Sequence, residues 1–265
     1  MFKVLKRIYA IAYRHVVVWP KDMGAMVDAF WWPSFDMLLW GLMTVYIQRQ
    51  QTEAMPFLTA FIIGGIVFWM FVYRSQQEMG VLFLREFWDK NLLAVLSTPI
   101  SITEYFIATM CVGILKLIIS GVYMSFLGWI LFQFNIFLFG WYLVPFILTL
   151  TVVGLWTGFL VMGLVIQYGY RVQSLAWSMI MVIMPFSAVF YPVTVLPTWM
   201  QSVARFIPSS YVFEGMREVI AKGNMDMRTL LIANALNLVY TILSCLFFAW
   251  GFKRARINGM IVKFS

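Results

Sequence analysis

Long runs of apolar residues constrain this chain more than any other feature of its sequence. They recur along most of its 265 residues, and several reach the length of about 20 residues that a helix needs to cross about 30 Å of hydrocarbon. Hydrophobic residues make up 63% of the chain and charged residues 11%, against about 45–50% and about 25% in soluble proteins. A soluble fold of this size has too little polar surface to cover so much apolar material. We therefore predict an all-α integral membrane protein, with a single transmembrane domain over residues 1–265.

The first 28 residues are too rich in basic side chains to cross a membrane. Apolar residues recur there at helical spacing, as at Leu5, Ile8 and Ala12, which predicts an amphipathic helix lying in the membrane interface over residues 1–28. A signal peptide is the alternative interpretation. It is disfavoured because Arg14 and His15 interrupt the apolar core that such a peptide needs.

Six membrane-spanning helices are predicted after this segment. Their approximate ranges are 29–47, 56–74, 102–132, 138–168, 173–191 and 229–252. The third and fourth are longer than one bilayer thickness requires, so we expect them to tilt or to project beyond the lipid. Gly154 and Gly158 lie about one turn apart in the fourth span, a spacing that permits close packing of a neighbouring helix.

The distribution of basic residues predicts the orientation of the spans. An even number of spans places both termini on one side of the membrane. That side carries 13 of the lysines and arginines, the opposite side carries five, and Lys116 lies within a span. Because cytoplasmic loops are enriched in lysine and arginine, we predict that both termini are cytoplasmic and that the chain resides in the cell (inner) membrane.

Two segments outside the spans carry most of the functional information. One is the cytoplasmic stretch 75–101, and the other is the outward stretch 192–226. Three prolines divide the outward stretch: Pro192, Pro197 and Pro208. Because proline breaks a helix, we expect two short re-entrant or interfacial helices, at about 198–206 and 210–221.

Several kinds of site have no basis in the sequence. No G-x-x-x-x-G-K-[ST] loop occurs, so the chain does not bind ATP in the P-loop manner. Cys111 and Cys245 lie inside apolar runs and His15 is the single histidine, so we predict no disulfide framework, no metal site and no catalytic residues. The net charge of +8 is explained by membrane orientation, and nucleic acid is not expected as a partner.

Two ionisable residues fall inside predicted spans. Asp36 lies in the first span and Lys116 in the third. A charged side chain in hydrocarbon costs about 2.5–3.5 kcal/mol, so it usually has a partner or faces a wet cavity. Two interpretations are open: the residues pair and fix two helices, or they face a transport pathway. Asp36 is also close enough to the cytoplasmic end of its span to reach the interface.

A further group of polar residues lies in the second short outward helix. Glu214, Arg217 and Glu218 are spaced at i, i+3 and i+4, which allows either an ion pair within the helix or a polar gate at the outer mouth. Together with Trp199 they are the predicted outer gate. A passive cap is the alternative.

Two sets of residues resemble a known family. The first lies in and after the loop: Leu96, Pro99, Ile100, Glu104 and Tyr105. The second precedes the last span: Pro192, Leu196, Pro197, Trp199, Pro208 and Arg217. In this order, and with the interfacial N-terminal helix, they resemble the permease subunits of type 2 ATP-binding cassette exporters, a family that includes polysaccharide, teichoic-acid, nodulation-factor and drug exporters. Gly215 departs from the pattern because it places a glycine within the second short helix.

The resemblance implies that two copies of the chain pair and that each docks a separate ATPase subunit. ATP and Mg²⁺ would then lie on the partner, and this chain would hold no cofactor. Arg85, Glu86, Asp89 and Lys90 are the candidate docking residues, because mixed charges suit a protein partner. A solvated loop with no partner is the alternative.

The leading functional hypothesis is the membrane subunit of an ATP-driven exporter of amphiphiles, such as drugs, lipids or lipid-linked glycans. An ion-coupled secondary transporter is the alternative, but it needs polar residues and broken helices near the bilayer midplane, ideally in two corresponding halves of the chain. Only Asp36 and Lys116 are such polar residues, and no repeat of one half in the other is evident. A membrane-embedded enzyme is disfavoured because carboxylates do not cluster and only His15 is available as an imidazole.

Overall fold

The computed structural model describes residues 2–50, 57–88, 100–172 and 174–257. Over these ranges the chain is helical and contains no β-strand, which confirms the predicted all-α fold. In chain order the α-helices are α1 (Phe2–Val18), α2 (Met23–Met26), α3 (Trp32–Gln50), α4 (Leu58–Trp88), α6 (Ile102–Phe132), α7 (Leu143–Tyr168), α8 (Leu175–Phe186), α9 (Thr198–Ala204), α10 (Pro208–Lys222) and α11 (Met227–Ile257).

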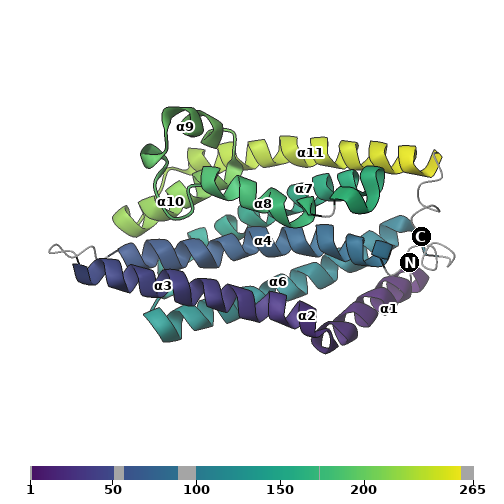
Figure 1. Cartoon of the computed structure of the whole chain (residues 1–265), viewed down its shortest axis with the longest axis horizontal. Coiled ribbons are helices and arrows are strands. Elements are labelled where there is room, and N and C mark those ends of the chain that lie inside the picture. Colours follow the sequence, from purple (N-terminus) through teal and green to yellow (C-terminus); the bar gives the residue numbers. More distant parts are fainter. Residues whose placement is uncertain (1, 51–56, 89–99, 173, 258–265) are drawn as a thin grey trace.

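The long helices run roughly along one axis and give the molecule two distinct ends (Figure 1). The start of α1, the end of α4 and the end of α11 lie at one end, on the right of the picture. The short helices α9 and α10 lie at the other end. The amphipathic N-terminal segment forms α1, which packs on α6 through Ile11, Tyr105 and Ala108 and meets α3 at an angle.

Four stretches of the described chain are long and apolar enough to cross a membrane: Leu58–Gly80, Thr103–Phe132, Ile136–Tyr168 and Met227–Ala255. They correspond to the second, third, fourth and sixth predicted spans, so a multi-pass membrane protein is confirmed. The helix at the first predicted span, α3, contains Asp36 and Arg49 among its 19 residues. At the fifth, α8 has 12 residues, or about 18 Å of helix.

Two predicted boundaries differ from the structure. The second span was expected to end near residue 74, but α4 continues to Trp88, so residues 75–88 of the predicted cytoplasmic stretch are helical. The helix can continue because its first charged residues, Arg74 and Glu78, find partners inside the bundle. The fifth span was expected to reach residue 191, but α8 ends at Phe186, one residue after Pro185.

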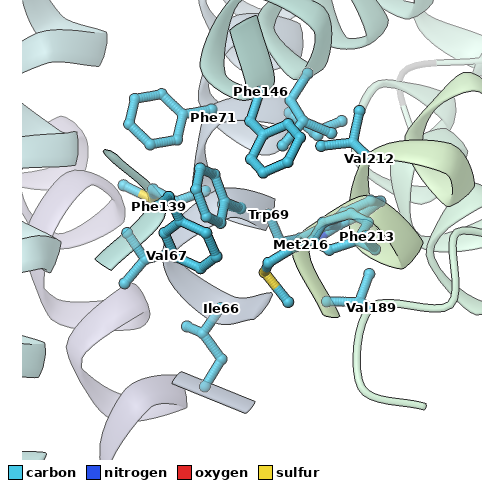
Figure 2. Packing of buried hydrophobic residues seen from close by; sticks show 14 of the residues in the cluster. Ile66, Val67, Trp69, Phe71, Phe139, Phe146, Val189, Val212, Phe213 and Met216 are labelled. Atoms are coloured by element: carbon cyan, nitrogen blue, oxygen red, sulfur yellow. The ribbon is translucent and has the colours of Figure 1, made fainter. Parts of the chain in front are cut away.

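The core lies where α4, α7 and α10 meet. Phe68 of α4 packs against Phe139 and Phe146, with ring centres 4.9 and 5.8 Å apart. Trp69, the next residue of α4, packs against Phe213 of α10 at 6.2 Å, and α10 also adds Met216 (Figure 2). Polar contacts join α7 to α11: the Trp156 indole donates to the Asn237 side-chain oxygen at 3.1 Å, and the Asn237 amide donates to the Thr149 carbonyl at 3.0 Å. Such hydrogen bonds between helices complement the apolar packing where lipid surrounds the bundle.

Small residues let α7 approach α4 closely, as the Gly154 and Gly158 spacing predicts. A Cβ added at Gly154 would overlap the Ser75 hydroxyl and the Val72 carbonyl of α4, and one at Gly158 would overlap Met79. Gly215 has a similar role in α10, where an added Cβ would lie 2.7 Å from the Met225 methyl group. The glycine in the second short helix therefore serves packing.

Replacing Gly154 by leucine is expected to prevent correct packing of α4 on α7. The obstruction includes backbone, which cannot rotate away, so the destabilisation should exceed the roughly 1–3 kcal/mol typical of overpacking. We expect loss of the monodisperse peak in size-exclusion chromatography in mild detergent, with Gly154→Ala intermediate. Val144→Phe adds bulk to the same helix at an exposed position and should behave like the unmodified chain. A monodisperse Gly154→Leu protein at normal yield would contradict the packing described here.

Candidate functional site

Four charged side chains, Asp28, Arg74, Glu78 and Lys116, form a continuous ion-pair network inside the bundle. The Arg74 guanidinium contacts an Asp28 carboxylate oxygen at 2.7 Å and a Glu78 oxygen at 3.0 Å. The second Glu78 oxygen accepts from the Lys116 ammonium at 2.8 Å. The Tyr73 hydroxyl donates to Asp28 at 3.2 Å. Two cations and two carboxylates make the network neutral.

The network joins three elements that are distant in sequence. Asp28 lies in the π-helical turn Val27–Trp31, Arg74 and Glu78 are one turn apart on α4, and Lys116 is on α6. The Arg74, Glu78 and Lys116 side chains are 3%, 10% and 9% exposed. Charges so deeply buried need close partners of opposite sign. Lys116 also lies 5.4 Å from the centre of the Trp19 ring, a cation–π contact.

A cavity of about 580 Å³ lies next to this network. Its lining comes from the π-helical turn, α3, α4, α6, α8 and the segment after α8: Asp28, Trp32, Pro33, Asp36, Trp40, Ile66, Trp69, Met70, Tyr73, Met124, Met181, Met184 and Phe190. Trp40 and Phe190 stack with ring centres 4.7 Å apart and planes 20° apart, and so form one wall. The cavity is therefore mainly aromatic and sulfur-rich, with two carboxylates.

The segment after α8 is held by a buried arginine. The chain leaves helical geometry there, with Ala188 at a positive φ of 54°. Arg217 of α10 donates through Nη2 to the carbonyls of Ala188, Val189 and Tyr191, the last at 2.6 Å. Its Nη1 lies 3.3 Å from a Glu214 oxygen that also accepts from the Val193 backbone amide.

This arrangement explains why residues 187–193 can leave a helix inside an apolar bundle. Backbone carbonyls without helical partners must be satisfied by protein or water, because lipid offers no donors. The planar guanidinium supplies several donors in a fixed geometry. Phe190, which lies between the anchored carbonyls of Val189 and Tyr191, is thereby placed against Trp40. The outward segment and the cavity are thus physically connected.

The outward segment has the predicted form of two short helices. α9 (Thr198–Ala204) follows Pro197, and α10 (Pro208–Lys222) begins at Pro208, so the prolines separate them as expected. Proline suits the first position of a helix because its missing amide donor has no partner there. The expected starts and ends agree with the structure to within two residues.

Residues 21–221, well over half of the chain, match the family model described as ABC-2 type transporter. The chain belongs to the ABC-2 type transporter family. A comparison with curated proteins finds no match. Family membership confirms the resemblance drawn from the sequence and makes this chain a transporter permease rather than a catalytic unit. Within the described ranges, no three His, Cys, Asp or Glu side chains are placed to hold a metal ion.

The two charged residues that fall inside predicted spans of this ABC-2 transporter do not pair with each other. Lys116 pairs with Glu78, and Asp36 lines the cavity, where it takes part in no hydrogen bond or ion pair within the described residues. Of the two open interpretations, the ion pair between Asp36 and Lys116 is therefore excluded. The physical reason is that α4 continues beyond residue 74, which places Glu78 inside the bundle and in contact with Lys116.

Only two of the four predicted outer-gate residues of the ABC-2 chain pair with each other. Glu214 pairs with Arg217 within α10, and Glu218 pairs instead with Lys222 at 3.0 Å. Trp199 is 62% exposed, with its ring edge-on to Phe186 at 6.2 Å between centres. The helix therefore contains the ion pair that the spacing allowed, and Arg217 additionally reaches across to the segment after α8. Whether the group gates release stays a prediction.

The predicted docking residues lie at the edge of the described chain. Arg85 and Glu86 belong to the last turns of α4. Asp89 and Lys90 fall outside the described residues. Their role in docking an ATPase subunit stays a prediction.

Four residues of the site in this ABC-2 transporter are not predicted from the sequence: Asp28, Tyr73, Arg74 and Glu78. Asp28 falls just before the first predicted span, and Arg74 and Glu78 fall at and beyond the expected end of the second. One sequence feature could have identified Arg74 and Glu78 as a pair. Arg74 and Glu78 are four residues apart, which is the spacing of an ion pair on a continuing helix.

Proposed function

We propose that this chain is the membrane-spanning subunit of an ATP-driven exporter that moves an amphiphile out of the cytoplasm or the inner leaflet. The observation that carries the proposal is the aromatic cavity, which lies among the spans and shares Phe190 with the segment anchored to α10. An amphiphile needs such a site, because its apolar body requires aromatic surface and its polar group requires a charge or dipole. Family membership supports export by a permease.

The energy for transport would come from a separate ATPase subunit. This chain has no P-loop sequence, and α4 extends eight residues beyond the apolar stretch Leu58–Gly80, which is about 12 Å of helix. We place the docking surface at this projecting end, with Arg85, Glu86, Asp89 and Lys90 contacting the partner. Two copies of the chain and two ATPase subunits would form the complex, with ATP and Mg²⁺ on the ATPase subunits.

The projecting end of α4 would face the cytoplasm. The start of α1 and the end of α11 lie at the same end of the bundle as the end of α4 (Figure 1). The predicted side of the termini also carries 13 of the 19 basic residues, which favours cytoplasmic termini in a cell (inner) membrane. The opposite end, with α9 and α10, would then be the outer mouth, and closure of the ATPase pair would switch the bundle between two states.

One observation favours a second candidate function, an ion-coupled secondary transporter. Asp36 is an intramembrane carboxylate without an ion-pair partner among the described residues, and such residues often carry protons or ions. The two candidates differ in their energy source. Transport that follows an ion gradient and proceeds in the absence of any ATPase subunit would favour the second.

The docking proposal predicts that Glu86→Lys combined with Asp89→Lys abolishes capture of the ATPase subunit. Like charges placed against a complementary surface cost several kcal/mol, so we expect at least a tenfold loss of co-purified partner and of ATP-dependent export from inverted vesicles. The matched control, Glu86→Asp with Asp89→Glu, keeps both charges and should retain the partner. Full capture and export by the charge-reversed chain would show that these residues do not dock the partner.

A further inference from the structure

We propose that the cavity binds a cationic amphiphile, with Asp36 as its counter-charge and the tryptophan and tyrosine rings as its walls. The inference rests on the proposed function, because it names the class of substrate that the exporter would take. It depends on three features of the described residues: the charge balance around the cavity, the chemistry of its walls, and its size and opening.

The charge balance leaves one carboxylate without compensation. Asp28 lines the cavity, but Arg74 contacts it at 2.7 Å and Tyr73 donates to it at 3.2 Å. Glu78 contacts both Lys116 and the second Arg74 nitrogen, so the four residues of the network together carry no net charge. Asp36 has no such partner among the described residues, so its ionised form gives the cavity one net negative charge. A monovalent cation is the ligand that restores neutrality in a surrounding of low polarity.

The walls favour an organic cation over a metal ion. Trp32, Trp40, Trp69 and Tyr73 all line the cavity that holds Asp36. Aromatic faces attract quaternary and other soft cations, and the attraction grows when water is displaced. A hard metal ion instead needs several oxygen ligands. Two carboxylates, one of which is already committed to Arg74, do not supply them.

The size and the remaining lining suit an extended or multi-ring body. The volume of about 580 Å³ falls within the range of about 300–1,000 Å³ found for small-molecule sites. Met124, Met181 and Met184 provide adaptable thioether contacts. Trp32 and Met181 are 57% and 56% exposed in the single chain, so the cavity opens on the side of α3 and α8. A ligand dissolved in the bilayer could therefore enter without crossing the core.

Two organic ions of the same shape and opposite charge test the proposal directly. Tetraphenylphosphonium and tetraphenylborate each present four phenyl rings around one central charge. We expect the purified chain in neutral-lipid nanodiscs to bind radiolabelled tetraphenylphosphonium saturably. After subtraction of the partitioning into empty nanodiscs, the affinity for tetraphenylborate should be at least tenfold lower. Equal affinity for both ions, or saturable binding of neither, would overturn the proposal.

Substitutions of residues that line the cavity test whether tetraphenylphosphonium binds there. Asp36→Asn removes the charge at nearly constant volume and should weaken tetraphenylphosphonium binding at least tenfold, while Asp36→Glu should retain it. Trp69→Leu should weaken both ions, because it removes aromatic surface without changing charge. Asp226→Asn is the matched control, since it removes an exposed carboxylate from the turn before α11. Unchanged binding in Asp36→Asn would place the cation elsewhere and reject the inference.

The binding experiment is independent of the exporter proposal. It uses this chain without an ATPase subunit, so capture of that subunit and selection of a cation can fail separately. If the chain captures the ATPase subunit but does not distinguish the two ions, the exporter proposal stands and the cationic substrate is wrong. If cation selection holds but export needs no ATPase subunit, the cavity assignment stands and secondary transport is favoured.

Discussion

Replacing Glu78 by glutamine is expected to be among the most destabilising single changes available in this chain. Glu78 is the only residue that contacts both Arg74 and Lys116 in the described network, and both cations are buried. Its loss leaves Lys116 without its carboxylate and Arg74 with Asp28 alone. Breaking a buried ion pair by removing one partner costs about 3–5 kcal/mol. We expect a large fall in melting temperature in mild detergent and a loss of monodisperse protein.

Removing the stranded cation should reverse most of this effect. The double variant Glu78→Gln with Lys116→Gln restores neutrality, since Arg74 and Asp28 still form a pair at 2.7 Å. It should therefore be more stable than Glu78→Gln alone. If the destabilising effects of the two substitutions simply added, the double variant would be the less stable of the two. Glu218→Gln, at an exposed ion pair of α10, is the control and should change stability by about 1 kcal/mol or less. A double variant less stable than the single one would show that the two charges are not coupled.

The sequence predicts the helical content and the longest spans because hydropathy alone decides them. Four stretches contain enough consecutive apolar residues to be recognised without reference to the rest of the chain. The ends of helices are less accessible to the same reasoning. Arg74 and Glu78 appear in the sequence as charges that end a span. Their partners, Asp28 and Lys116, are distant in sequence, so the sequence does not show that these charges are neutralised. A charge marks the end of a span only when it lacks a partner.

In the site, too, some features follow from the local sequence and others depend on tertiary packing. Asp36 and Lys116 could be selected because isolated charges in apolar runs are rare, but their partners depend on how the helices pack. Lys116 pairs with Glu78, a residue 38 positions earlier, at 2.8 Å. The stack of Phe190 on Trp40 also depends on tertiary structure, because it requires α8 to end at Phe186 and Arg217 to hold the following carbonyls. No local pattern contains that information.

Arg217→Leu is expected to release the segment after α8 and so to alter both the outward segment and the cavity. Three carbonyls lose a charged donor, and each buried polar group left unsatisfied costs about 1–3 kcal/mol. We expect the amides of residues 187–195 to exchange hydrogen at least tenfold faster, while α6 keeps its protection. Because Phe190 lies within this segment, its stack on Trp40 should loosen. ATP-dependent export should fall at least tenfold.

Two further variants separate the anchoring role of Arg217 from its charge. Arg205→Leu removes a basic side chain from an exposed position just after α9 and should change neither exchange nor export. Arg217→Lys keeps the charge but has only one nitrogen, so it cannot contact Glu214 and donate to the carbonyls through separate atoms, as Nη1 and Nη2 of Arg217 do. It should fall between the leucine variant and the unmodified chain. Unchanged exchange in Arg217→Leu would contradict the anchor itself. Faster exchange with full export would retain the anchor, but it would make the outward segment a passive cap, because a gate cannot lose its position without affecting release.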